Sequence, residues 1–252
     1  MKNIHHLAEQ VRELEKELSV CIRCGMCQSV CPLFEQTRKE TDVARGKLAL
    51  LNGLVSEMFS DPDGVSERLN RCLLCGSCAA NCPSGVSILE IFIRARSILA
   101  DYKGLSLAKK LLFKKMLASP KVFDTLSELA SGIQDLALKD EENPQGTSCA
   151  RFSPPLLRGR HVLPMAKTPF HKAVKNLRSD SGSGPRVLFF TGCLIDKILP
   201  QIAHASVRVL RHHGARVIIP HGQGCCGIPA LASGDMNTFS DLAAHHAGLF
   251  EK

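Results

Sequence analysis

Two copies of one cysteine phrase constrain this chain more than any other feature of its sequence. The first, CIRCGMCQSVCP, runs from Cys21 to Pro32, and the second, CLLCGSCAANCP, runs from Cys72 to Pro83. Both read C-x2-C-x2-C-x3-C-P, a spacing in which three thiolates hold one iron–sulfur cube and the fourth reaches a neighbouring cube. The repeat therefore predicts two [4Fe–4S] clusters, and electron transfer is the first functional hypothesis.

The spacing predicts crossed ligation between the two runs. Gly25 and Gly76 lie between the second and third cysteines, where a missing Cβ permits a tight turn and lets backbone N–H groups face a cluster. Pro32 and Pro83 then fix φ and turn the chain away. The expected ligand sets are Cys21, Cys24, Cys27 and Cys82 for the first cube, and Cys72, Cys75, Cys78 and Cys31 for the second.

Two other readings of these cysteines are weaker. A disulfide scaffold suits small secreted domains, whereas this chain has 252 residues, twelve cysteines and no signal peptide. Structural zinc also takes four thiolates, but it does not require this longer spacing twice over. We therefore expect metal-bound, reduced cysteines in a cytoplasmic protein.

Composition narrows the classes of partner. No apolar stretch approaches the ~18 residues of a membrane span, so we expect no transmembrane segment. The formal charge of +8 counts every thiol as neutral, and cluster binding would make the protein less basic. One tyrosine and no tryptophan leave little to stack bases on, which argues against nucleic acid. A set of lysines reads as a solvated helix face: Lys109, Lys110, Lys114 and Lys115.

The hydrophobic pattern predicts an α+β protein whose first domain, residues 1–139, is all-helical apart from the cluster loops. Apolar periodicity predicts helices over residues 4–18, 44–58, 88–99, 105–118 and 121–138, with a short helix before the second cysteine run. Ser87 and Glu90 have the spacing of a capping box. Residues 140–185 are rich in Pro, Gly and Ser and read as a linker, in which the lone Cys149 is expected to be unligated.

Residues 186–252 change to an α/β pattern. Two short buried strands, 187–190 and 217–219, flank a helix over 198–213, which predicts a parallel pair with a crossover. Cys193 follows the first strand, and Cys225 and Cys226 follow the second, so all three should lie at the carboxyl edge of the sheet. Cysteines between glycines at such an edge favour metal or redox chemistry over simple packing.

A few other polar residues receive modest expectations. Asp196 could hydrogen-bond the cysteine loop, and Arg45 and Lys47 could tune a cluster or contact a partner. Three His-His pairs fall within expected helices, where neighbours point to different faces, so we expect them to be exposed or partly buried rather than ligands. These pairs are His5 and His6, His212 and His213, and His245 and His246.

The chain resembles the iron–sulfur subunit of glycolate oxidase. The resemblance rests on the two cysteine runs, on the DVARGK segment at 42–47 between them, and on TGCLID and GQGCCGIPALASGD within 187–235. Related lactate-utilisation, anaerobic glycerol-3-phosphate dehydrogenase and heterodisulfide reductase subunits share this architecture. It implies a helical ferredoxin-like two-cluster domain followed by a cysteine-rich "CCG" domain. That domain is expected to be partial here, because family members usually continue with a later CxxC pair, and the sequence reads as truncated or completed by another chain.

The resemblance also implies a function. An FAD-containing partner subunit would oxidise a 2-hydroxy acid of the glycolate or lactate type. This chain would pass the electrons toward a quinone or another membrane acceptor, and would lie at the inner face of the membrane only through its partners. No catalytic residue is assigned to the chain itself. The alternative is a catalytic subunit of the heterodisulfide reductase type, with a third iron–sulfur centre at Cys193, Cys225 and Cys226.

Overall fold

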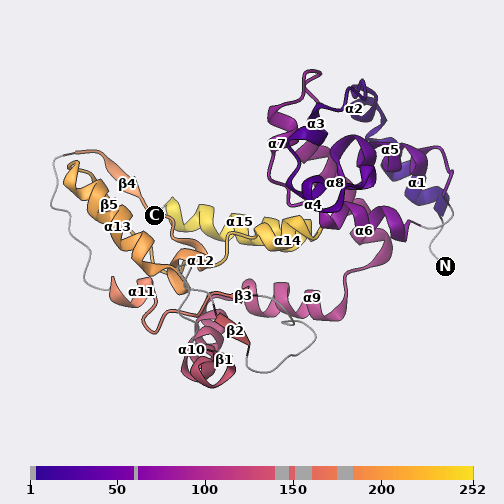
Figure 1. The fold of residues 1–252 in the computed structure, drawn as a ribbon. Coiled ribbons are helices and arrows are strands. Elements are labelled where there is room, and N and C mark those ends of the chain that lie inside the picture. Colours follow the sequence, from indigo (N-terminus) through magenta and orange to yellow (C-terminus); the bar gives the residue numbers. More distant parts are fainter. Residues whose placement is uncertain (1–3, 60–61, 140–147, 151–160, 175–183, 252) are drawn as a thin grey trace. The chain divides into compact units, whose positions relative to one another are not determined.

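The computed structural model describes residues 4–59, 62–139, 148–150, 161–174 and 184–251. Figure 1 shows the elements in chain order. The chain divides into two compact units, Met1–Lys110 with Ile228–Phe239, and Leu111–Gly227 with Ser240–Lys252. Each unit is described by itself. Among the described residues, no helix combines the length and the apolar character that crossing a bilayer requires.

The first unit is helical, as its periodicity predicts. It contains α1 (Ile4–Arg12), α2 (Glu15–Ser19), α3 (Met26–Ser29), α4 (Pro32–Thr37), η1 (Glu40–Asp42), α5 (Ala44–Val55), α6 (Asp63–Arg71), α7 (Ser77–Ala80), α8 (Ile88–Lys103) and, from the far end of the chain, α14 (Ile228–Ala232). The short helix α9 (Leu107–Leu111) begins in this unit, and α15 (Met236–Phe250) belongs partly to each.

One apolar core joins these helices. The expected core face of α8 is buried at Ile88, Ile91, Phe92, Ala95 and Leu99. The core takes in Leu7, Val11, Leu14 and Leu18 near the N-terminus, Leu48, Leu51 and Leu54 of α5, and Leu69 of α6. Five of the run cysteines pack against it: Cys21, Cys27, Cys72, Cys78 and Cys82. The cysteine loops are therefore anchored on a packed scaffold.

Several helix boundaries and one predicted cap differ from prediction; the expected helix 105–118, for example, is α9 followed by a π-helical turn over Leu112–Leu117. The expected helix 4–18 breaks before Glu15, because the N–H of Leu14 bonds to Val11 in a tighter turn. Helix α5 ends at Val55, three residues early, where Glu57 takes a positive φ and Met58 bonds back to the carbonyl of Gly53. Ser87 does precede α8, but its side chain makes no capping hydrogen bond, so the predicted capping box is wrong.

The second unit is mixed. It contains the π-helical turn η2 (Leu112–Leu117), α10 (Pro120–Ala137), β1 (Leu138–Lys139), β2 (Ser148–Ala150), β3 (His161–Val162), α11 (Phe170–Ala173), β4 (Arg186–Leu188), α12 (Gly192–Lys197), α13 (Pro200–His212) and β5 (Arg216–Ile218). Strands β1, β2 and β3 form a small antiparallel sheet. The predicted linker thus contains short elements, and residues 140–147, 151–160 and 175–183 of it lie outside the described part.

The predicted parallel strand pair is present. Strands β4 and β5 pair in parallel, with Arg186 opposite Arg216, Val187 opposite Val217 and Leu188 opposite Ile218. Helices α12 and α13 lie between these strands in the sequence. A second core forms beneath them from Phe170, Val174, Ala203, Val207 and Val217. Phe170, from the region expected to be a linker, is fully buried there.

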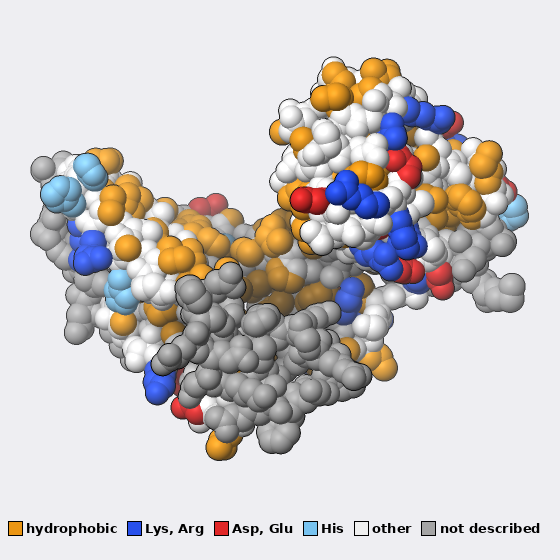
Figure 2. Space-filling view, viewed as in Figure 1, with side chains coloured by type: hydrophobic (Ala, Val, Ile, Leu, Met, Phe, Trp, Pro, Cys, Tyr) orange, Lys and Arg blue, Asp and Glu red, His pale blue; other side chains and the backbone are white. Residues whose placement is uncertain are grey.

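The surface of the first unit carries charges of both signs. On the face drawn in Figure 2, Lys and Arg side chains of this unit are interspersed with Asp and Glu. Lys109 and Lys110 of this unit are exposed, as are Lys114 and Lys115 of the second unit, as expected for solvated helix faces. The expected domain boundaries at residues 139 and 186 remain a prediction.

Candidate functional site

Two cavities in the first unit are lined by the eight repeated cysteines. One is lined by Cys21, Cys24, Cys27 and Cys82. The other is lined by Cys31, Cys72, Cys75 and Cys78. Each cavity therefore joins three cysteines of one run to the last cysteine of the other, which is the grouping that the spacing predicts. Ala44 and Ile88 line both cavities, so the two share a wall.

The two cysteine loops have matching backbones. Gly25 (φ +89°) and Gly76 (φ +81°) take left-handed conformations at equivalent positions, and each precedes a one-turn helix, α3 or α7. The residues two places earlier, Arg23 (φ 57°) and Leu74 (φ 52°), also have positive φ. A backbone N–H points at a thiol in the second loop, where Leu74 N lies 3.5 Å from Cys72 Sγ. This curled backbone brings N–H groups and sulfurs to one side of each loop.

Helix α5 supplies one cation to each cavity. Arg45 lines the first cavity and Lys47 the second. The Arg45 guanidinium binds Glu40 through Nε at 2.5 Å and Nη2 at 3.1 Å, and its Nη1 donates to the Arg23 carbonyl at 3.3 Å. Lys47 is buried, and its Nζ donates to the carbonyl of Asp42. The N-terminal end of α5, which carries partial positive charge, faces the wall that the cavities share.

A third cation, Arg96, holds the backbone of the second cysteine loop. Arg96 of α8 is 4% exposed, and its guanidinium donates to three backbone carbonyls. The acceptors are Leu69, Cys72 at 2.6 Å and Ala232 of α14 at 2.6 Å. Sequence reasoning missed Arg96, because the 24 residues that separate it from Cys72 carry no signal of their approach.

The protonation of the cysteines fits a metal-binding role. Burial, with smaller contributions from the neighbouring thiols of Cys72, Cys27 and Cys75, raises the pKa of Cys78 to about 11. Burial likewise raises the pKa of Cys27. Hydrogen bonds from Ser77 lower the pKa of Cys75, which is exposed. Thiols held in such a group ionise readily only when a cation binds with them, so loading would release protons. Four sulfurs per cavity, with a cation of α5 in each cavity wall, match the needs of an anionic iron–sulfur cluster.

The other three candidate cysteines lie at the edge of the β4–β5 sheet, as predicted. Cys225 is fully buried, Cys193 is half-buried and Cys226 is exposed. A hydrogen bond from Cys225 lowers the pKa of Cys193 to about 7, despite an opposing effect of burial. The same bond and burial raise the pKa of Cys225. This places a thiolate-prone sulfur beside a protonated one. The side chain of Cys149 lies outside what the structure describes.

Gln223, rather than the predicted Asp196, ties the cysteine loop to its neighbour. Its Oε1 accepts from the N–H of Thr191 at 2.9 Å, and its Nε2 donates to the carbonyls of Phe189 at 3.0 Å and Pro220 at 3.1 Å. The segments that follow β4 and β5 are thereby joined. The glycines around Gln223 marked this loop in the sequence, but not the role of its amide.

One of the histidine pairs also supports this loop. His246 is buried, accepts from Gly224 N at 3.1 Å through Nε2, and bonds the carbonyl of Leu242 through Nδ1 at 2.7 Å. Burial lowers the pKa of His246, so the ring is neutral and can accept. His245 Nε2 lies 2.9 Å from the carbonyl of Gly222. The other two pairs are exposed or partly buried, as expected.

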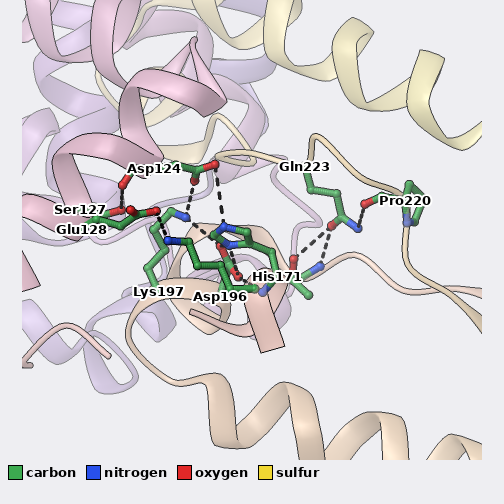
Figure 3. A network of polar contacts seen from close by, with 10 residues as sticks. Asp124, Ser127, Glu128, His171, Asp196, Lys197, Pro220 and Gln223 are labelled. Atoms are coloured by element: carbon green, nitrogen blue, oxygen red, sulfur yellow. Dashed lines mark hydrogen bonds and ion pairs between the residues drawn. The ribbon is translucent and has the colours of Figure 1, made fainter. Parts of the chain in front are cut away.

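Asp196 instead belongs to a polar network with His171, Lys197 and Asp124 (Figure 3). Its carboxylate accepts from the backbone N of His171 at 2.7 Å and lies 2.8 Å from His171 Nδ1. Lys197 Nζ bridges Asp196 at 2.8 Å and Asp124 at 2.5 Å. Among the described residues, Asp124, His171 and Asp196 form the one group of three whose metal-ligating atoms all lie within 4.8 Å of one another. Because the Lys197 ammonium bridges both carboxylates and His171 binds Asp196, the network reads as an ion-pair cluster that joins α10, α11 and α12.

These features define a class of protein, and comparison with known families agrees. Residues 17–86 match the 4Fe-4S dicluster domain, and residues 187–252 match the Cysteine-rich domain. The chain is therefore an iron–sulfur protein in which a dicluster domain precedes a cysteine-rich CCG domain.

The relatives that the chain is similar to include glycolate oxidase iron–sulfur subunits. The chain is 30% identical over 246 residues to the probable glycolate oxidase iron-sulfur subunit of Bacillus subtilis, covering 94% of this chain and 55% of that protein. It is 26% identical over 226 residues to the glycolate oxidase iron-sulfur subunit of Escherichia coli, covering 88% and 50%. Over 102 residues it is 35% identical to an iron-sulfur subunit of the CoB–CoM heterodisulfide reductase of Methanopyrus kandleri, covering 40% and 50%.

These findings confirm the resemblance seen in the sequence and the expectation of iron–sulfur clusters. The chain spans about half the length of the relatives that it matches. No solved structure matches it. The description of the fold as α+β is confirmed in part, since the described residues are mostly helical, with the parallel pair and a small antiparallel sheet as their strands.

Proposed function

We propose that this chain is the electron-transfer subunit of a flavin-dependent 2-hydroxy-acid dehydrogenase of the glycolate or lactate type. The observation that carries the proposal is the pair of cavities, each lined by three cysteines of one run and one of the other. A [4Fe–4S] cluster accepts and releases one electron at a time, whereas a reduced flavin carries two, so two such clusters suit a relay between a flavin and a one-electron step.

The residues of the chain have distinct tasks in this proposal. Cys21, Cys24, Cys27 and Cys82 hold one cluster, and Cys31, Cys72, Cys75 and Cys78 hold the other. Backbone N–H groups of the cysteine loops, such as that of Leu74 beside Cys72 Sγ, stabilise the negative charge of the sulfurs. Helix α5 keeps the two sites adjacent, because its first residue, Ala44, lines both cavities.

We assign the flavin to a partner, because the described residues contain no dinucleotide-binding unit. Gly222, Gly224 and Gly227 do have GxGxxG spacing after β5, but the helix that follows, α14, is only five residues long. A dinucleotide fingerprint needs a βαβ unit of about 30 residues, and no strand follows β5 among the described residues. We therefore propose that an FAD-containing subunit oxidises the substrate and donates the electrons.

The acceptor and the location complete the proposal. A quinone or another membrane acceptor would receive the electrons. We place the protein in the cytoplasm, at the membrane only through partners, because every cysteine whose side chain is described is unpaired.

Anaerobic purification followed by iron and acid-labile sulfide analysis tests the proposal directly. We expect about eight irons and eight sulfides per chain, from two cubes of four irons each. Material that stays colourless and free of sulfide after reconstitution would reject it. Zinc without sulfide would identify a structural zinc module instead.

Paired cysteine variants test the crossed ligation. Cys31→Ala and Cys75→Ala should alter the same electron paramagnetic resonance (EPR) signal of the reduced protein, and Cys82→Ala and Cys24→Ala should alter the other. Cys226→Ala is the control, since Cys226 is exposed and lines neither cavity. If Cys31→Ala altered the same signal as Cys24→Ala, each run would hold its own cluster and the crossed assignment would be wrong.

One observation favours a second candidate function. The hydrogen bond between Cys193 and Cys225 produces a thiolate-prone sulfur at a glycine-rich sheet edge, as a catalytic subunit of the heterodisulfide reductase type would require. That function predicts a third iron–sulfur centre. Iron well above eight per chain that falls back to about eight in the Cys225→Ala variant would favour it over the relay.

A further inference from the structure

We propose that the cluster held by Cys31, Cys72, Cys75 and Cys78 has the higher reduction potential of the two and is the first to accept an electron, because Lys47 and Arg96 place buried positive charge against it. The inference rests on the proposed electron-transfer function. It ranks the reduction potentials of two clusters whose cysteine runs have the same spacing, so the spacing alone does not distinguish them.

Lys47 lies at the wall of this cavity and is almost completely buried. It is 1% exposed, although its side chain is among the longest in the unit. Its Nζ donates to the Asp42 carbonyl oxygen, and Cys31 Sγ lies 3.9 Å from that same oxygen. The ammonium and a cysteine sulfur thus meet at one backbone atom.

Arg96 adds a second buried cation, which contacts the loop through its backbone. Its guanidinium donates to the Cys72 carbonyl at 2.6 Å. The acceptors of its guanidinium are neutral backbone carbonyls, and among the described residues no carboxylate forms an ion pair with it, so its positive charge is not cancelled by a bound anion. Both cations therefore act on the cluster that contains Cys72.

The charges near the first cavity are arranged differently. Two cations line this cavity. Arg23 is exposed, and Arg45 is bound in a two-point ion pair by Glu40, with side chains that are 29% and 47% exposed. An anion at this distance cancels most of the field of the guanidinium, and water screens the remainder. The second cavity also has a buried carboxylate in its wall, Asp42, whose oxygens have no hydrogen-bond partner among the described residues. Arg68 Nη1 lies 3.5 Å from Asp42 Oδ1, and this ion pair offsets the carboxylate charge, so Lys47 and Arg96 remain in excess.

The physical consequence follows from the direction of charge change. Reduction adds one negative charge to a site, and a buried cation stabilises that charge more strongly than an exposed, paired one. Cluster potentials respond to net local charge and to solvent exposure. The second cavity has an excess of buried cations and the first does not, so the second site is the easier one to reduce.

The substitution Lys47→Gln separates charge from structure. The glutamine amide can still donate a hydrogen bond toward the Asp42 carbonyl, so a purely structural role of Lys47 would leave the potential unchanged. In an EPR-monitored redox titration of the cluster-loaded protein, we expect the signal that Cys75→Ala removes to become at least tenfold harder to reduce, a shift of about 59 mV for one electron. The matched control is Arg45→Gln on the same helix, which should shift the other signal by less.

The order of the two potentials in the unmodified protein gives an independent test. The signal lost in Cys75→Ala should appear at higher potential than the signal lost in Cys24→Ala. The reverse order would overturn the inference, as would an unchanged potential in a Lys47→Gln protein that carries both clusters. If Lys47→Gln failed to load clusters, the order in the unmodified protein would decide alone. Absence of clusters from the unmodified protein would instead reject the proposed function.

Discussion

At the scale of single residues, glycines decide how closely the cysteine-bearing segments approach their neighbours. A Cβ on Gly25 would lie 2.6 Å from Arg45 Nη1, beside the first cavity. A Cβ on Gly234 would lie 2.4 Å from the carbonyl oxygen of Arg96, the residue that holds the Cys72 loop. Both glycines also have positive φ. At Gly234 the obstructing atom belongs to the backbone, so two separate requirements select glycine there, whereas the end of the Arg45 side chain beside Gly25 can shift.

The pair Gly234→Ala and Gly85→Ala separates these two requirements. Gly85 has φ +65° and open space where a Cβ would lie, so alanine there meets only the backbone cost, about 1–2 kcal/mol. Gly234 has φ +84° and a backbone oxygen in the way, so alanine should destabilise the protein by more. Urea unfolding followed by circular dichroism measures the difference. Equal losses in the two variants would show that α14 moves away from α8 without cost.

At the scale of elements, the Asp196 network joins three helices of the second unit. Asp196 and Lys197 lie on α12, His171 on α11 and Asp124 on α10. Burial tends to raise the pKa of Asp196, but hydrogen bonds from His171 and Lys197 outweigh it, and the net pKa is lowered. The lowered pKa means that the ionised carboxylate contributes to folding.

Replacing Asp196 with asparagine should therefore destabilise the protein at neutral pH, by about 2 kcal/mol for a charged hydrogen bond. The folded pKa lies below the unfolded value, so this contribution is complete above the ordinary pKa of an aspartate, near pH ~4, and is lost as pH falls through the folded value. Urea midpoints of the original and variant proteins should differ at neutral pH and converge at acid pH.

The control for this prediction is Glu128→Gln. Glu128 pairs with Lys172 at 2.7 Å, but the two side chains are 42% and 43% exposed, so the pair should matter little. A pH-independent loss in Asp196→Asn would mean that shape, and not charge, gives Asp196 its effect.

The sequence predicts those elements whose pattern is local. Three features can each be recognised from a short stretch of sequence: the repeated cysteines, the core stripe of α8 and the two short apolar strands. The partnership of His171 with Asp196 cannot be recognised in this way, because 25 residues separate the two and no periodicity relates them. The same holds for Arg96 and the Cys72 carbonyl. Short strands such as β1 and β3 are stabilised by pairing across the chain, which a local pattern cannot express.

At the scale of the whole molecule, the formal charge of +8 describes a chain whose thiols are all protonated. Cluster loading deprotonates the ligating cysteines and adds net negative charge at each site. Isoelectric focusing under anaerobic conditions should place the loaded protein at a lower pI than the cluster-free protein. Cys24→Ala, with one cluster intact, should migrate between them. Identical positions for the loaded and cluster-free forms would contradict the loss of thiol protons.

Each cavity takes cysteines from both runs, and this has a consequence for biosynthesis. When only the first cysteine run has been synthesised, one cavity has three of its four cysteines and the other cavity has one. Cys78 is the last cysteine of one cavity to be synthesised, and Cys82, four residues later, is the last of the other. Neither cavity has its four cysteines until the second run has been synthesised. Both cluster sites should therefore become complete at nearly the same time, and we expect the two clusters to be inserted together.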